Sequence, residues 1–179
     1  ADASSIPAAV LRYKVKNLTN KPTRISIAGS LANESCKHAH NDAVHEIRRT
    51  NGATGLLFSC PQHGKDRLRC GSMSLSTSHT AVTAKREWLR GGWRDGAQDF
   101  WDDFCSDGKL EPDSHYANGQ IGSADPYRIG SLAVSHEIAP GEEQTFEFIL
   151  SWNFPNRPQG WWEKKPEATD KLGDVIIPN

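Results

Sequence analysis

The sequence has no excess charge of either sign and no long apolar run. Lys and Arg total 21 and Asp and Glu total 22, which gives a formal net charge of -1 at pH 7. This balance provides no broad basic surface for nucleic acid or an anionic membrane, so we expect neither as a partner. No apolar run approaches the roughly 20 residues of a membrane-spanning helix, so we expect no transmembrane segment. Residues 1–10 also lack the basic and apolar regions of a signal peptide. These absences predict a soluble chain.

Cysteine is scarce, and the motifs of several enzyme classes are missing. Four cysteines in 179 residues are too few for a disulfide-dense small domain, and their spacing leaves the redox compartment open. The sequence has no G-x-S-x-G nucleophile elbow, no P-loop and no G-x-G-x-x-G motif. We therefore expect neither a cofactor nor an enzyme confined to these residues. About one Asn-x-Ser/Thr sequon is expected by chance, so the two at Asn17 and Asn33 carry no weight.

Apolar and polar residues alternate near the start of the chain, as they do in half-buried strands. The run Leu11–Lys16 alternates apolar and basic residues, and Ile25–Leu31 alternates apolar and polar ones. A polar turn at Asn17–Pro22 separates the two runs. This arrangement predicts an antiparallel hairpin.

The alternation is clearer near the end of the chain. Leu132–Ile138 and Phe146–Phe154 each place apolar residues on one face, and a Pro-Gly turn at Ala139–Glu142 joins them. This predicts a second hairpin, and His136, on the apolar face, is interpreted as a hydrogen-bonded core histidine. Shorter strand candidates lie between the two ends, at Gly55–Cys60, Gly71–Thr77 and Ala81–Trp88. The spacing predicts an all-β fold, an antiparallel β-sandwich with long loops and one short helix.

The helical candidate is Ala97–Cys105, where aromatic residues recur at i, i+1 and i+4 before an Asp-Gly turn at Gly108. The segments Lys37–Thr50 and Glu111–Pro126 are polar and without period, so both are predicted to be long loops.

We divide the chain into a sandwich, residues 1–157, and a connector, residues 158–179. The connector is rich in proline, which indicates a segment that leaves the sandwich. The chain starts at Ala1 and ends in the apolar run Val175–Asn179 without a capping signal. We therefore expect it to be part of a longer polypeptide.

Two groups of residues have side chains of the types that bind zinc. They are Cys36, His38, His40 and His45 in the first group and Cys60, His63 and Cys70 in the second. Structural zinc sites usually contain two tight ligand pairs, and neither group contains a CxxC or HxxxH pair. We interpret both as polar loops and expect no metal.

Acidic and aromatic residues cluster between Asp99 and Asp107. A retaining glycosidase needs two carboxyl groups about 5 Å apart that face a sugar between them. Asp102 and Asp103 are adjacent and point apart, whereas Asp99 and Asp103 would share one helix face and cannot flank a substrate. We expect these acids to serve in capping, salt bridges and docking, with no catalytic residue among them.

Four further motifs occur in a fixed order along nearly the whole chain. They are Ser4–Tyr13 followed by Asn17, Gly91–Trp93, Phe100–Phe104 with Asp107–Leu110, and Ser151–Arg157. Together they resemble the N-terminal region of glycoside hydrolase family 116, which includes the bile-acid type, or non-lysosomal, glucosylceramidases and bacterial β-glucosidases.

The resemblance implies an N-terminal β-sandwich joined to a C-terminal (α/α)6 barrel. That barrel would hold both catalytic carboxylates of a retaining β-glucosidase and would act on a β-glucoside or a glucosylceramide-like substrate. No family nucleophile or acid/base position falls within this chain. The resemblance therefore implies a non-catalytic domain whose partner is the barrel of the same polypeptide.

The segment Gly91–Leu110 contains more aromatic surface than one short helix can bury. We expect part of it to dock on the barrel, and the docking candidates are Trp93, Trp101, Asp102, Asp103, Trp152 and Arg157. In the alternative, Phe100 and Phe104 enter the sandwich core and Trp101 caps it. A second alternative for the whole chain is a free-standing carbohydrate-binding or interaction sandwich.

Overall fold

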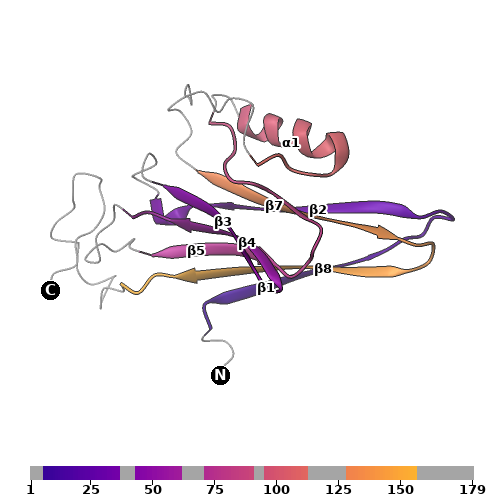
Figure 1. Ribbon diagram of the computed structural model, residues 1–179, viewed down its shortest axis with the longest axis horizontal. Coiled ribbons are helices and arrows are strands. Elements are labelled where there is room, and N and C mark those ends of the chain that lie inside the picture. Colours follow the sequence, from indigo (N-terminus) through magenta and orange to yellow (C-terminus); the bar gives the residue numbers. More distant parts are fainter. Residues whose placement is uncertain (1–5, 37–42, 62–70, 91–94, 113–127, 157–179) are drawn as a thin grey trace, which may run out of the picture.

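Two antiparallel β-sheets face each other across an apolar core, and one helix lies on the outer face of the smaller sheet (Figure 1). The structure is a computed structural model and describes residues 6–36, 43–61, 71–90, 95–112 and 128–156. Its architecture confirms the predicted all-β antiparallel sandwich.

The larger sheet has the strand order β1-β8-β5-β4-β3, and the smaller sheet has the order β2-β7-β6. The strands of the larger sheet are β1 (Ala8–Lys16), β3 (Val44–Thr50), β4 (Ala53–Ser59), β5 (Ser72–Thr77) and β8 (Glu143–Asn153). The smaller sheet contains β2 (Thr23–Ala32), β6 (Val82–Lys85) and β7 (Ile129–Ile138). The helix is α1 (Asp95–Asp107), and a single 3-10 turn spans Glu34–Cys36.

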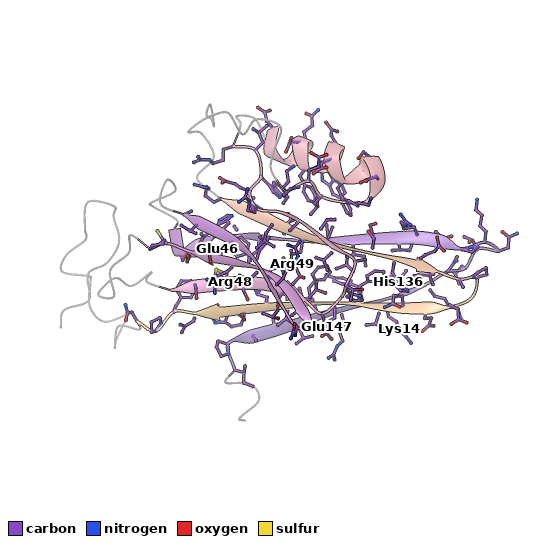
Figure 2. All side chains as sticks on the ribbon, in the orientation of Figure 1. Lys14, Glu46, Arg48, Arg49, His136 and Glu147 are labelled. Carbon is purple, nitrogen blue, oxygen red and sulfur yellow. The ribbon has the colours of Figure 1, made fainter. Side chains whose placement is uncertain are left out.

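The strands β1, β2, β7 and β8 form at the predicted places, but both predicted hairpins are wrong. β1 pairs with β8 in the larger sheet, and β2 pairs with β7 in the smaller one. Each connection therefore crosses from one sheet to the other instead of joining neighbours. Apolar alternation is the same in both arrangements, because a strand buries one face whether the next strand lies beside it or across the core. On the outer face, Arg12 and Lys14 of β1 form ion pairs with Glu147 and Glu143 of β8 at 2.6 and 2.5 Å (Figure 2).

Asn17 ties the two crossing connections together. Its side-chain amide donates to the carbonyl oxygens of Lys21 at 2.9 Å and Ile138 at 2.8 Å. Its backbone N–H donates to Glu142, and its carbonyl accepts from Gly141, which has a φ of 78°. Asn17 is 5% exposed, so the asparagine of this sequon is a buried residue that stabilises the fold through its hydrogen bonds.

The predicted loop Lys37–Thr50 is wrong from Val44 onward, because β3 begins there and pairs with β4. The turn between the two strands is Asn51-Gly52, and Gly52 has a φ of 110°. Asn-Gly between two strands is a strong hairpin signal. β3 was missed because its exposed residues are charged, as is usual for an edge strand. The second predicted loop, Glu111–Pro126, lies outside the described residues after Pro112.

The core lies between the inner faces of β4, β5, β7 and β8. Its buried members are Leu56, Phe58, Leu75, Ala84, Leu132, Val134, Ile138, Phe146 and Phe148. β4, β5 and β6 occupy the three predicted short strands, although β6 ends at Lys85.

The interpretation of His136 as a core histidine is wrong, because the residue is exposed. It shares a strand face with Val134, but β6 begins opposite Val134, so no β6 residue lies beside His136. Its side chain therefore reaches solvent past the end of β6.

Candidate functional site

Helix α1 packs on the outer face of the smaller sheet through one aromatic face. Phe100 is 5% exposed and forms a cluster with Leu110 and Ala133 of β7. Gly96 lies against Leu89, where a Cβ would collide with the backbone carbonyl. The helix spans two more residues at each end than the predicted Ala97–Cys105. It buries its apolar side, as the spacing of its aromatic residues requires.

An aromatic stack fixes this contact. The rings of Trp88 and Phe100 are stacked with centroids 4.6 Å apart, and Phe104 stacks on Phe100 at 5.9 Å. The Trp88 indole N–H donates to the Ser131 hydroxyl at 2.7 Å, which satisfies its polar group. These aromatic residues lie outside the sandwich core, between the helix and the sheet, so the alternative in which Phe100 and Phe104 enter that core is wrong.

Trp101 lies outside this contact. Its ring meets the edge of Phe100 with centroids 5.4 Å apart, yet the residue is 55% exposed. Cys105, one turn later on the same side, is a free and exposed cysteine. α1 therefore presents a large aromatic side chain to solvent beside a face that is already packed.

A buried lysine holds the acidic residues of α1. Lys85 on β6 is 1% exposed, and its ammonium lies 3.1 Å from the Asp103 carboxylate and 3.4 Å from that of Asp99. Asp103 also accepts the backbone N–H of Glu111 at 3.1 Å. Asp99 and Asp103 share a helix face as predicted, and that face points toward the sheet. Among the docking candidates, Asp103 therefore contacts its own domain, and any effect on docking would be indirect.

The remaining docking candidates do not form one surface. Asp102 is exposed on α1 near Trp101. Trp152 is 36% exposed near the end of β8, in the other sheet, and Figure 1 shows α1 and β8 on opposite sides of the sandwich. Trp93 and Arg157 lie outside the described residues. The exposed candidates on one side are thus Trp101 and Asp102.

Sequence reasoning did not identify Lys85. The available signal was the spacing of Asp99 and Asp103, which predicted one acidic helix face but not what that face would meet. Lys85 lies in the predicted strand Ala81–Trp88 at an ordinary polar position. Its burial becomes evident only when α1 is placed on β6.

The candidate metal residues are dispersed in the described part of the chain, where no three potential ligands come together. Cys60 is disulfide-bonded, so it cannot supply a thiolate to a metal. His45 faces the core edge, where its ring meets Phe58 and its Nδ1–H donates to the Arg86 carbonyl at 2.7 Å. Burial lowers the pKa of His45 to about 4. His38, His40, His63 and Cys70 lie outside the described residues, as does the side chain of Cys36.

Among the described residues, no helix is both long enough and apolar enough to span a membrane. A family model described as beta-glucosidase 2, glycosyl-hydrolase family 116 N-term, matches residues 1–170 of the chain. No curated protein sequence matches it.

Proposed function

Since the chain belongs to the N-terminal family of glycosyl-hydrolase family 116, we propose that it is the non-catalytic domain of a β-glucosidase and packs against the catalytic barrel of the same polypeptide. The match covers most of the chain and confirms the resemblance found in the sequence. A β-glucoside, or a glucosylceramide-like lipid, would then be bound and hydrolysed in the (α/α)6 barrel. The connector 158–179, outside the described residues, would lead toward that barrel.

The arrangement of the acids supports a non-catalytic role. A retaining hydrolase needs one carboxylate free to attack the sugar and a second free to exchange protons, about 5 Å apart. Asp99 and Asp103 instead lie on one face of α1 and both approach the ammonium of Lys85. Their position between helix and sheet leaves no room for a sugar between them.

The observation that carries the docking proposal is the exposure of Trp101. Phe100, Phe104 and Trp88 pack on one another, whereas Trp101 remains 55% exposed on the same helix. Interfaces are enriched in tryptophan anchors of this kind. A sugar-binding platform is less well supported, because the neighbouring Trp88 is packed on Phe100 and its indole N–H is already bonded.

The test compares Trp101→Ala with Trp152→Ala in the full-length β-glucosidase and in this chain alone. Trp152 is the matched control, because it is the exposed tryptophan of the opposite sheet. We expect Trp101→Ala to weaken association of the two domains and lower hydrolysis of an aryl β-glucoside. In the isolated chain it should change the free energy of unfolding by less than about 1 kcal/mol, as for a surface position.

A loss of about 3–5 kcal/mol in the isolated chain would show that Trp101 is a core residue and would refute the docking proposal. An effect of Trp152→Ala on activity, with none from Trp101→Ala, would place the barrel on the other side. Activity on glucosylceramide compared with aryl glucosides would test the lipid-like substrate.

A further inference from the structure

The free edge of β1 carries most of the large apolar side chains that the described part of the chain exposes to solvent. Val10, Leu11 and Tyr13 of β1 are 50%, 43% and 49% exposed, and Ile6, just before the strand, is 62% exposed. β1 pairs with β8 on one side, and among the described residues no strand pairs with its other side. An unpaired edge with apolar side chains is a surface on which another strand can add.

The other edge strand of the larger sheet, β3, differs in this respect. Its exposed side chains include Glu46, Arg48 and Arg49, which oppose the approach of another strand (Figure 2). The basic residues of β1 are already engaged, because Arg12 and Lys14 form ion pairs with glutamates of β8. The edge of β1 is therefore the more adhesive of the two.

The exposed apolar residues lie on both faces of β1. Leu11 and Tyr13 stand opposite the buried Phe148 and Phe146 of β8, so they belong to the inner face of the sheet. There they border a groove of about 90 Å³ that β2 lines on its other side. Val10 lies on the outer face. A strand added beside β1 would therefore bury apolar surface on both faces.

The hydrogen bonds between β1 and β8 determine which backbone groups face the free edge. Directly after β1, the Asn17 N–H donates to the Glu142 carbonyl at 3.0 Å. Bonded and non-bonded pairs alternate along an antiparallel ladder, so the odd-numbered residues of β1 bond to β8. The N–H and C=O groups of the even-numbered Val10, Arg12 and Lys14 therefore point to the free edge.

The charges of β1 select one register for pairing with a second β1. In an antiparallel pair centred on Leu11, Leu11 faces itself, Val10 faces Arg12, and Ala8 faces Lys14. A pair centred one residue later would place two Arg12 side chains opposite each other, which destabilises a sheet. A pair centred one residue earlier would join fewer residues. The register about Leu11 therefore gives the longest ladder without opposed like charges.

We propose that β1 is a dimerisation edge, on which the β1 of a second copy of this chain pairs in the register centred on Leu11. The two larger sheets then join into one across a twofold axis. In each half, the aliphatic stems of Arg12 and Lys14 cover Val10 and Ala8 of the other copy. The twofold axis closes the assembly at two copies.

The sandwich has room for this arrangement. The twofold axis places both smaller sheets on the same side of the joined sheet, with the two β1 strands between them. Because the inner face of β1 is open beside the groove, Leu11 of each copy can pack on Leu11 of the other. One strand pair with its flanking side chains is a small interface, so we expect a dissociation constant of about 10–100 µM.

The dimer goes beyond the proposed function and does not depend on it. Figure 1 shows α1 on the outer face of the smaller sheet, away from β1. Trp101 would therefore remain free for the catalytic barrel in both copies.

The first test is sedimentation equilibrium of the chain 1–179 with Cys105→Ser, which removes the exposed free cysteine. We expect the average mass to rise from that of a monomer toward that of a dimer between about 5 and about 500 µM protein. A monomer at every concentration would overturn the proposal, as would growth beyond two copies. No catalytic domain is present, so the result is independent of whether α1 docks on the barrel.

The second test reverses the charge at one position of the interface. Val10→Lys places a cation opposite Arg12 of the other copy and should raise the dissociation constant about tenfold or more, whereas Val10→Glu should leave it within about threefold. Leu18→Lys is the matched control, because Leu18 is 85% exposed outside β1 and should have no effect. Equal weakening by Val10→Lys and Val10→Glu would overturn the register, as would no weakening by either.

The third test is disulfide trapping, which adds no charge to the interface. The two Cα atoms at position 11 would lie about 4.5 Å apart, within the range of a disulfide. Those at position 13 would be about 14 Å apart. Under mild oxidation, Leu11→Cys should give a dimer whose disulfide joins position 11 of both copies, identified by peptide mapping. Tyr13→Cys, at a similarly exposed position, should not. Equal trapping at both positions, or none at position 11, would overturn the proposal.

Discussion

Acidification should destabilise the domain through His45. The ring lies with its centroid 4.7 Å from that of Phe58, and in the described part of the chain its Nε2 is buried without a hydrogen-bond partner. Burial is the largest cause of its low pKa of about 4, and the nearby Arg128 lowers the pKa further. The bond to the Arg86 carbonyl acts in the opposite direction and is outweighed.

The sign and size of the effect follow from proton binding. The pKa of His45 is about 4 in the folded chain and 6.5 in the unfolded chain, so between these values the unfolded state binds the proton. The stability from the neutral ring is therefore present above pH 6.5 and is lost as pH falls toward 4. The free energy of unfolding should fall by about 2 kcal/mol between about pH 7 and about pH 5, and by about 3 kcal/mol below the folded pKa.

The assay is urea unfolding at both pH values for the unmodified chain, His45→Asn and His136→Asn. The amide nitrogen of asparagine can take the place of Nδ1 and donate to the Arg86 carbonyl, but it cannot be protonated. We expect the pH dependence to shrink by about 2 kcal/mol in His45→Asn and to persist in His136→Asn, whose histidine is exposed. Equal pH dependence in all three proteins would refute the reasoning, as would an NMR titration of the His45 ring near 6.5.

Four further substitutions test the described contacts by chemical denaturation. Lys85→Met leaves two partly buried aspartates without their cation and should cost about 3 kcal/mol, and a cost below about 1 kcal/mol would show that the ion pairs contribute little. Gly108→Ala should cost about 2–3 kcal/mol, because φ is 75° and a Cβ would collide with the Ser26 hydroxyl. Gly141→Ala, with a φ of 78° and open space, should cost only about 1 kcal/mol, so equal costs would contradict the collision. Asn17→Ala removes the bonds that its amide donates to the Lys21 and Ile138 carbonyls, of which the second is buried, and should cost about 2–3 kcal/mol with an unchanged m-value.

The sequence predicts strands better than their partners. Alternation in Leu11–Lys16 and Ile25–Leu31 correctly indicates which residues point inward, because that depends only on the period of a strand. Whether the next strand lies beside the first or across the core depends on contacts with β7 and β8, more than a hundred residues away. No local pattern carries that information.

The sequence was sufficient to predict the helix of the candidate site but not the residues of the sheet that contact it. The spacing of Phe100, Trp101 and Phe104 is sufficient to predict an aromatic helix with one side partly exposed. The division between buried Phe100 and exposed Trp101 depends on where Trp88 and Ala133 meet the helix, and therefore on the sheet beneath. Lys85 could not be found for the same reason.

The pairing of the first strand with the last sets the order of events during synthesis on the ribosome. β1 leaves the exit tunnel early, but its hydrogen-bonding partner β8 is completed only at Asn153. Until then β1 lacks its neighbour, and β2 lacks its own until β7 ends at Ile138, so their apolar faces are open to nonspecific association. Closure across so long a stretch of chain is slow, so folding should begin with the local pairs β3–β4 and β4–β5 and end with β7 and β8. A ribosome stalled before residue 153 would therefore hold a chain that chaperones bind and proteases cut, whereas one stalled well beyond it would hold a finished sandwich.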